Sequence, residues 1–162
     1  MTTGVYAGTF DPITNGHMDI IRRSKQFCSK LIILIGINPF KKTLFSEDER
    51  VSLIKQSCLN EDNVFVESYN GLIVEFAKTV GHSVLIRGIR SVSDFEYEIN
   101  LANVNRVLAP QIETVFLPTS PELAVVSSSM VKEIAKFGGN ISSFVSSPVA
   151  EAIKEKLNNS AK

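Results

Sequence analysis

Residues 8–17 combine side chains and backbone features that suit an anion. The segment reads Gly-Thr-Phe-Asp-Pro-Ile-Thr-Asn-Gly-His and follows a short apolar run. Gly8 lets a ligand approach the backbone closely, and a helix that starts near Gly16 presents free N–H groups and a positive dipole end to a phosphate. A neutral His17 could donate one ring proton to a phosphate oxygen, and a protonated His17 would add charge.

We therefore expect a phosphate-binding loop at residues 8–17. The alternative is a turn with a capping histidine, because glycine, proline and asparagine also fill turns that bind nothing. The segment has neither the Walker pattern nor the dinucleotide fingerprint. Asp11, beside Pro12, is expected to support the loop rather than contact a ligand.

Cationic side chains follow two further apolar runs. Lys41-Lys42 comes after the run 31–37, and Arg87-Gly88-Ile89-Arg90 comes after 83–86. The guanidinium groups of two arginines so near each other in the sequence could hold one multiply charged group. The alternatives are a solvated lysine pair and arginines in surface salt bridges.

Hydroxyl and carboxylate groups complete the candidate set. Ser127-Ser128-Ser129 precedes a predicted helix; one serine caps it, and the others offer further donors to phosphates. Asp94 and Glu96 stand where the helix dipole alone favours acids. Glu98 is expected to face the site and to hold a ribose or a partner arginine.

Short apolar runs alternate with helical patterns along the chain. The predicted strands are 5–7, 31–37, 64–67, 83–86 and 113–117. The predicted helices lie within 13–27, after a capping box at Ser46 and Glu49, over 72–80, from a second capping box at Ser93 and Glu96 to about 108, and over 127–137 and 148–157.

This alternation predicts an α/β fold: a single-domain, doubly wound (Rossmann-like), five-stranded parallel sheet with helices on both faces. We expect one domain over 1–157 and a frayed tail over 158–162. Ligands of such sheets bind beyond the carboxyl ends of the strands. All the candidate residues above should therefore meet at one edge.

The bulk composition excludes several classes of protein. The 162 residues are 44% hydrophobic, and 17 basic side chains balance 17 acidic ones, which argues against a nucleic-acid binder with a general basic field. No run approaches the length of a membrane span, so we expect a cytoplasmic protein without a membrane partner. Cys28 and Cys58 are predicted to be reduced, and no metal-ligand cluster is apparent.

Three separated motifs resemble the bacterial phosphopantetheine adenylyltransferase family. Thr14-x-Gly16-His17 is similar to the T/H-x-G-H motif of the wider nucleotidyltransferase superfamily. The closer resemblance is carried, in matching order and spacing over nearly the whole chain, by 8–17, by 87–90 with 94–98, and by 127–129 with 131–133. Leu123-Ala124-Val125 departs from the family, many of whose members carry aromatics there.

The resemblance implies an enzyme that makes dephospho-coenzyme A and pyrophosphate from ATP and 4′-phosphopantetheine. It implies Mg²⁺ bound mainly through ATP phosphates and water, a homohexamer, and coenzyme A as a feedback ligand. By the same resemblance the catalytic residues are His17, Lys41 and Arg90, and the phosphopantetheine-binding residues are Thr9, Lys41, Ile73 and Arg87. The ATP-binding residues are Thr9, Phe10, His17, Gly88, Ile89, Arg90, Glu98, Leu123, Ala124, Val125, Val126, Ser127, Ser128 and Ser129, and none is expected to bind metal.

Charge suggests the mechanism. A phosphate monoester is already anionic at neutral pH and needs no general base, so the enzyme must align two anions and neutralise the leaving pyrophosphate. Two alternatives remain open: a sister transferase that acts on nicotinamide mononucleotide or uses CTP, and a non-catalytic nucleotide or coenzyme A sensor. Retention of His17, Lys41 and Arg90 disfavours the sensor.

Overall fold

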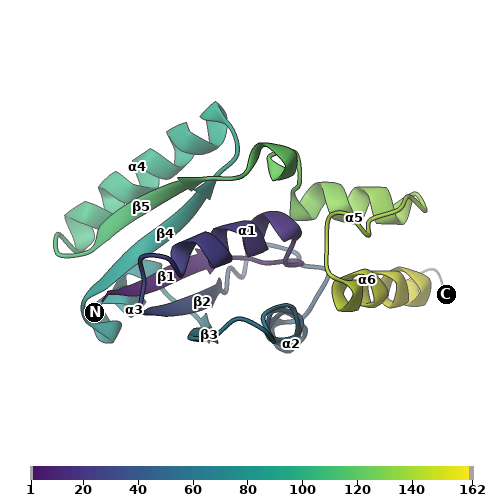
Figure 1. Ribbon diagram of the computed structural model, residues 1–162, viewed down its shortest axis with the longest axis horizontal. Coiled ribbons are helices and arrows are strands. Elements are labelled where there is room, and N and C mark those ends of the chain that lie inside the picture. The colour runs from purple at the N-terminus through teal and green to yellow at the C-terminus, as the bar shows by residue number, and fades with distance from the viewer. Residues whose placement is uncertain (1, 161–162) are drawn as a thin grey trace.

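A parallel sheet of five strands runs through the middle of the molecule (Figure 1). The computed structural model describes residues 2–160. The strand order is β3-β2-β1-β4-β5, and all neighbours are parallel. The strands are β1 (Thr3–Gly8), β2 (Lys30–Gly36), β3 (Val64–Tyr69), β4 (Ser83–Ile89) and β5 (Glu113–Pro118). From β1 the chain adds β2 and β3 on one side of the sheet and then β4 and β5 on the other. A ligand is therefore expected at the switch point between β1 and β4.

Helices cover both faces of the sheet, as predicted. They are α1 (Asn15–Ser24), α2 (Glu47–Ser57), α3 (Ile73–Val80), α4 (Val92–Leu108), α5 (Ser128–Lys136) and α6 (Ser147–Ser160), with a 3₁₀ turn at Pro121–Leu123. Alternate strand residues enter two separate cores. Ile33 and Ile35 pack with α1, α2, α5 and α6 on one face, while Ile32 and Leu34 pack with α3 on the other.

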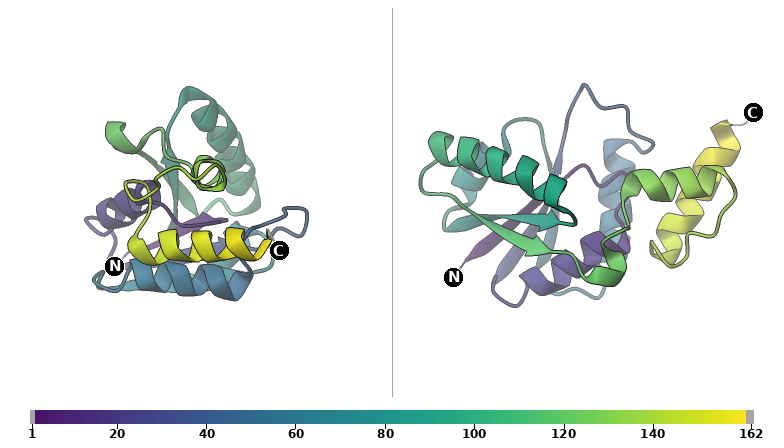
Figure 2. Two further views of the ribbon diagram at one scale, coloured as in Figure 1. Left: turned by 90° about the vertical axis from the view of Figure 1, so that its right-hand side faces the viewer. Right: turned by 90° about the horizontal axis from the view of Figure 1, so that it is seen from above.

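The two C-terminal helices extend the molecule beyond the carboxyl ends of the strands (Figure 1). Figure 2 shows α6 alongside α2, and Val149 and Ile153 of α6 are fully buried in the core on that face. The start of α5 lies against the loop after β1, where the Ser128 hydroxyl donates to the carbonyl of Pro12. Within residues 2–160, no helix has the length and apolar character needed to cross a bilayer.

The start of α4 differs from the prediction. The capping box at Ser46 and Glu49 is confirmed, but the one at Ser93 and Glu96 is wrong. Helix α4 begins at Val92, and the hydroxyl of Ser91 accepts the N–H of Asp94 at 3.2 Å. Because β4 runs directly into the turn, the first hydroxyl after it becomes the cap.

The ends of two other elements differ from the prediction. Strand β4 runs to Ile89, three residues past its predicted end, so Arg87, Gly88 and Ile89 lie in the strand itself. Helix α6 continues to Ser160, so residues 158–160 are helical rather than frayed. The last two residues of the predicted tail lie outside the described residues.

Candidate active site

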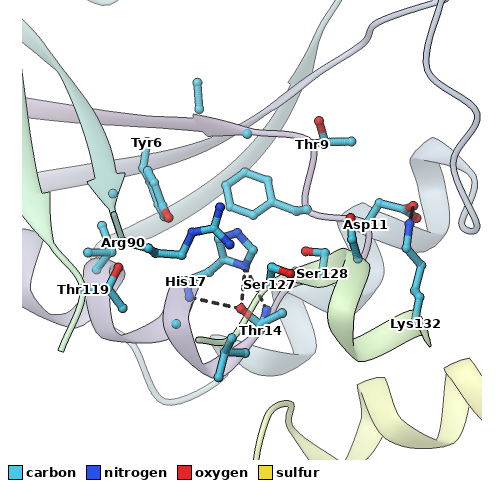
Figure 3. Close-up of a pocket in the computed structure, with 18 of the residues that line it drawn as sticks. Tyr6, Thr9, Asp11, Thr14, His17, Arg90, Thr119, Ser127, Ser128 and Lys132 are labelled. Carbon is cyan, nitrogen blue, oxygen red and sulfur yellow. Dashed lines mark hydrogen bonds and ion pairs between the residues drawn. The ribbon is translucent and has the colours of Figure 1, made fainter. Parts of the chain in front are cut away.

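A cavity of about 470 Å³ opens at the carboxyl ends of β1 and β4 (Figure 3). It is built from the end of β1 and its loop, the start of α1, the 41–43 segment, the end of β4, and the start of α5. Its lining residues are Tyr6, Ala7, Gly8, Thr9, Phe10, Asp11, Thr14, Gly16, His17, Ile20, Lys41, Lys42, Thr43, Arg87, Gly88, Arg90, Thr119, Val126, Ser127, Ser128, Ser129 and Lys132. Most of the predicted site residues therefore meet at one edge of the sheet.

The His17 ring is held by the cap of its own helix. Thr14 is the N-cap of α1, and its backbone N–H donates to Nδ1 of His17 at 3.0 Å. Nδ1 must then be the unprotonated nitrogen, which leaves the proton on Nε2. Burial, with a smaller contribution from the charge of Arg90, lowers the pKa of His17 to about 4. His17 is therefore a neutral hydrogen-bond donor, which resolves the two protonation states considered from sequence.

An aromatic group supports the same ring. Phe10 lies edge-on to His17, with ring centroids 5.0 Å apart, and edge-on to Tyr6 at 5.4 Å. The Phe10 side chain is only 2% exposed, and its φ is 48°. A bulky residue in this left-handed region costs about 1–3 kcal/mol and is typical of functional sites. With its ring buried, Phe10 can offer a ligand only its backbone.

Arg87 is fixed from two sides. Its Nε donates to Glu98 at 2.7 Å, its Nη2 donates to the other Glu98 oxygen, and its Nη1 donates to the carbonyl of Ala7 at 2.7 Å. Burial lowers the pKa of Arg87, but the hydrogen bonds and charge of Glu98 outweigh it and raise the pKa above its usual value. The guanidinium is thus a permanent cation held in one orientation.

Arg90 is freer. Figure 3 shows its side chain reaching toward His17, while its Nε donates to Asp94 at 3.0 Å. The arginine and its partner are both partly exposed, so this ion pair contributes little stability. A phosphate could replace Asp94 as the acceptor at small cost.

The three serines at the start of α5 have different partners. Ser127 caps the helix by accepting the N–H of Met130 at 3.1 Å, and Ser128 donates to the carbonyl of Pro12 at 2.7 Å. Ser129 is exposed. The first N–H groups of α5 have no partner within the helix, so this end of the cavity also favours an anion.

Cations dominate the wall of the cavity. Five Lys or Arg side chains line it against a single carboxylate, that of Asp11. Asp11 accepts N–H bonds from Leu44 and Phe45 and forms an ion pair with Lys132, so it supports the loop as expected. The described residues contain no cluster of three or more His, Cys, Asp or Glu side chains that would hold a metal.

Some predicted site residues lie outside the cavity wall. They are Ile73, Ile89, Glu98, Leu123, Ala124 and Val125. Glu98 sits behind Arg87 and accepts two hydrogen bonds from its guanidinium. Ile73 begins α3 near Gly36, at the end of β2. The Leu123–Val126 segment passes the start of α1, where the carbonyls of Leu123 and Val126 approach Gly16.

Five polar lining residues had no predicted role: Tyr6, Thr14, Thr43, Thr119 and Lys132. Thr14 is the cap and the partner of His17. The Thr-x-x-His spacing, read as a capping box with histidine in place of glutamate, could have revealed this role. Thr119 and Lys132 reach the cavity only through the tertiary fold.

Comparisons with known proteins identify the family of this chain. The cytidylyltransferase-like family model matches residues 5–134. A phosphopantetheine adenylyltransferase from Caldanaerobacter subterraneus subsp. tengcongensis is 49% identical over 160 residues, covering 99% of this chain and 100% of the relative. One from Clostridium botulinum (strain 657 / Type Ba4) is 48% identical over 158 residues, covering 98% and 96%. One from Heliobacterium modesticaldum is 47% identical over 156 residues, covering 96% and 93%.

A solved structure supports the fold. It is a candidate nicotinate-nucleotide adenylyltransferase from Vibrio parahaemolyticus, with a TM-score of 0.70, 12% identity, and coverage of 94% of this chain and 97% of its own. At that identity the likeness concerns the fold alone. The motifs, the cavity they line and the identity over nearly full length together show that this chain belongs to the phosphopantetheine adenylyltransferase family, within the cytidylyltransferase-like nucleotidyltransferases.

Proposed function

We propose that this chain transfers the adenylyl group of ATP to 4′-phosphopantetheine, giving dephospho-coenzyme A and pyrophosphate. Family membership supports the reaction. The observation that carries it at the site is the neutral His17 ring, held by Thr14 in a cavity that five cationic side chains line. Such a cavity suits two phosphorylated ligands that must meet.

The two substrates would occupy different sides of the cavity. We assign the acceptor phosphate to Thr9, Lys41 and Arg87. We assign the ATP phosphates to His17, Arg90 and the start of α5 at Ser127, Ser128 and Ser129. The Thr9 and Phe10 backbone and Gly88 would lie between the two.

The reaction would be a direct in-line displacement. An acceptor phosphate oxygen attacks the α-phosphorus of ATP, the bond from that phosphorus to the bridging oxygen breaks, and pyrophosphate leaves with the electron pair. His17 Nε2–H would stabilise the charge that develops on the α-phosphate, and Lys41 and Arg90 would neutralise the rest. No general base and no covalent enzyme intermediate are required.

Mg²⁺ fits this site only as a companion of ATP. The single lining carboxylate, Asp11, is already bonded to Lys132 and two backbone N–H groups. Hard cations prefer oxygen ligands and Mg²⁺ keeps several waters, so ATP phosphates and water would hold it. When bound, it would offset phosphate charge.

The remaining parts of the substrates would lie beyond the cavity wall. Ile73, at the start of α3, is proposed to contact the pantetheine arm. Ile89 and the segment Leu123–Val126 are proposed for the nucleotide side, and coenzyme A is a candidate competitive ligand because it carries the same arm. A cytoplasmic location stays a prediction.

We also propose a homohexamer. Helix α4 carries an unusual number of exposed apolar side chains: Val92, Tyr97 and Val107 are 76%, 68% and 81% exposed. Exposed apolar patches of this kind are typical of protein–protein contacts. Sedimentation equilibrium would test the assembly against the 17.8 kDa chain mass.

Pyrophosphate release tests the reaction. The purified chain with ATP, Mg²⁺ and 4′-phosphopantetheine should release pyrophosphate in proportion to the acceptor consumed, and ATP alone should give none. Release with CTP in place of ATP would point to a sister transferase. No release with any acceptor would point to a sensor.

A further inference from the structure

Asp11 joins three segments that are far apart in the sequence. It is 4% exposed. Its Oδ1 accepts the N–H of Phe45 at 2.9 Å, both its oxygens accept the N–H of Leu44 at 3.0–3.1 Å, and its Oδ2 accepts from Lys132 Nζ at 2.6 Å. Figure 3 shows Asp11 and Lys132 facing each other at the edge of the cavity.

These bonds anchor one end of a cationic loop. Residues 37–46 connect β2 to α2 and carry Lys41 and Lys42, both exposed and both lining the cavity. On the β2 side, the loop has a local turn in which Asn38 accepts the N–H groups of Phe40 and Lys41. On the α2 side, Phe45 is buried, and the Asp11 carboxylate accepts the backbone N–H groups of Leu44 and Phe45.

The same carboxylate lies on the segment that carries the other binding groups. Asp11 is two residues from Thr9 and six from His17. A carboxylate that accepts N–H groups from one segment and an ammonium from another fixes both relative to its own backbone. Position matters here, because a misplacement of about 1 Å between reacting groups costs about 100-fold in rate.

We propose that Asp11 is a positioning residue that sets the place of Lys41 relative to Thr9 and His17, with Lys132 as the counter-charge that keeps it in place. The kinetic part of this inference rests on the proposed function, and the structural part does not. Burial opposes ionisation of Asp11, but Lys132 and the Leu44 and Phe45 amides outweigh it and lower its pKa below the usual value.

The test compares Asp11→Asn with a matched control, Glu61→Gln. Glu61 is likewise a carboxylate in ion pairs, with Arg22 at 2.9 Å and Lys25 at 2.8 Å, but it does not line the cavity. Asparagine keeps one acceptor oxygen and places an amide donor beside the Lys132 ammonium. Amide hydrogen exchange by NMR should show loss of protection of Leu44 and Phe45 in Asp11→Asn only.

Steady-state kinetics gives the second readout. In Asp11→Asn the KM for phosphopantetheine should rise about 10- to 100-fold, the scale of one lost hydrogen bond between Lys41 and the charged acceptor, while the KM for ATP changes less than about threefold. A general loss of structure would affect both substrates equally. Unchanged amide protection, or equal changes for ATP and acceptor in a folded variant, would overturn the proposal.

A second variant decides the case in which Asp11→Asn does not fold. Lys132→Gln keeps the backbone bonds of Asp11 and removes its counter-charge, and Lys132→Arg keeps the charge. We expect a selective rise of the acceptor KM in Lys132→Gln and a smaller rise in Lys132→Arg; no rise in Lys132→Gln would contradict the proposal. If the wild-type protein itself releases no pyrophosphate, the proposed function fails while hydrogen exchange still decides the role of Asp11.

Discussion

The backbone N–H of Thr14 donates to Nδ1 of His17 at 3.0 Å, and the Thr14 hydroxyl lies at the same distance from that nitrogen. This contact determines which ring nitrogen is free. With Nδ1 occupied as an acceptor, the Nε2 proton is available to a ligand in the cavity. The cap of α1 therefore both starts the helix and prepares the His17 ring as a donor.

Removal of this donor should slow the chemical step. We expect His17→Ala to lower kcat by roughly 100-fold or more, the scale of one lost oxyanion donor, with a smaller effect on the KM for ATP. Pyrophosphate release under saturating substrates measures it. His82→Ala is the control, because His82 is exposed and does not line the cavity. Turnover of His17→Ala close to that of the control would remove His17 from the mechanism.

The neutral His17 should make the fold sensitive to acid. Its pKa is about 4 in the folded protein against an ordinary 6.5, so between these values the unfolded chain binds a proton that the folded one does not. The free energy of unfolding should therefore fall as the pH is lowered from about 6.5 toward 4, by at most about 3 kcal/mol. The ring is partly open to the cavity, which makes this an upper limit.

Urea denaturation at pH 7 and pH 4.5 measures the difference. His17→Gln should lose less stability over this range than the wild type, because glutamine does not titrate. The lowered pKa of Asp11 acts only below its usual value of 3.8, where its stabilising ionised form is lost. Identical pH dependence in wild type and His17→Gln would contradict the linkage.

Lys41 and Lys42 can be separated by substitution. Both are exposed at the cavity, and the acceptor phosphate is assigned to Lys41. Because a hydrogen bond to a charged group contributes about 1.5–3 kcal/mol, Lys41→Ala should raise the KM for phosphopantetheine about 10-fold or more and should change the KM for ATP less. Lys42→Ala is the matched control. A larger acceptor effect in Lys42→Ala would exchange the two roles.

Glu98 should act through Arg87. Glu98 is buried and bonds both Nε and Nη2 of the arginine. We expect Glu98→Gln to weaken phosphopantetheine binding and Arg87→Ala to weaken it further, with a double variant no worse than Arg87→Ala alone. Isothermal titration measures the affinities, and Glu96→Gln on the exposed side of α4 is the control. Additive losses would show that Glu98 contacts ligand independently.

The sequence predicts the sheet well because its pattern is strong there. The apolar run 31–37 is typical of a strand buried on both faces, and β2 contains the fully buried residues Ile33, Leu34 and Ile35. The carboxyl-end rule then places 8–17, 41–42 and 87–90 together, as the structure does. The alternation of strands and helices is enough to bring these loops to one edge of the sheet, and no side-chain contact has to be known.

Boundaries and pairings were less predictable. Two serines compete to cap α4, and only the turn after β4 decides for Ser91. The ion pair between Asp11 and Lys132 joins residues 121 positions apart, and no local pattern indicates it. The Phe10 ring is buried and its backbone is left-handed, and a sequence motif reveals neither feature.

Identification of the adenylylated product tests the central claim most directly. The purified protein would be given ATP and Mg²⁺ with equal amounts of 4′-phosphopantetheine, nicotinamide mononucleotide and nicotinate mononucleotide, and the products identified by mass spectrometry. We predict dephospho-coenzyme A as the only adenylylated product, with pyrophosphate in equal amount. An adenylylated mononucleotide as the main product, or ATP that remains intact, would contradict the proposed function.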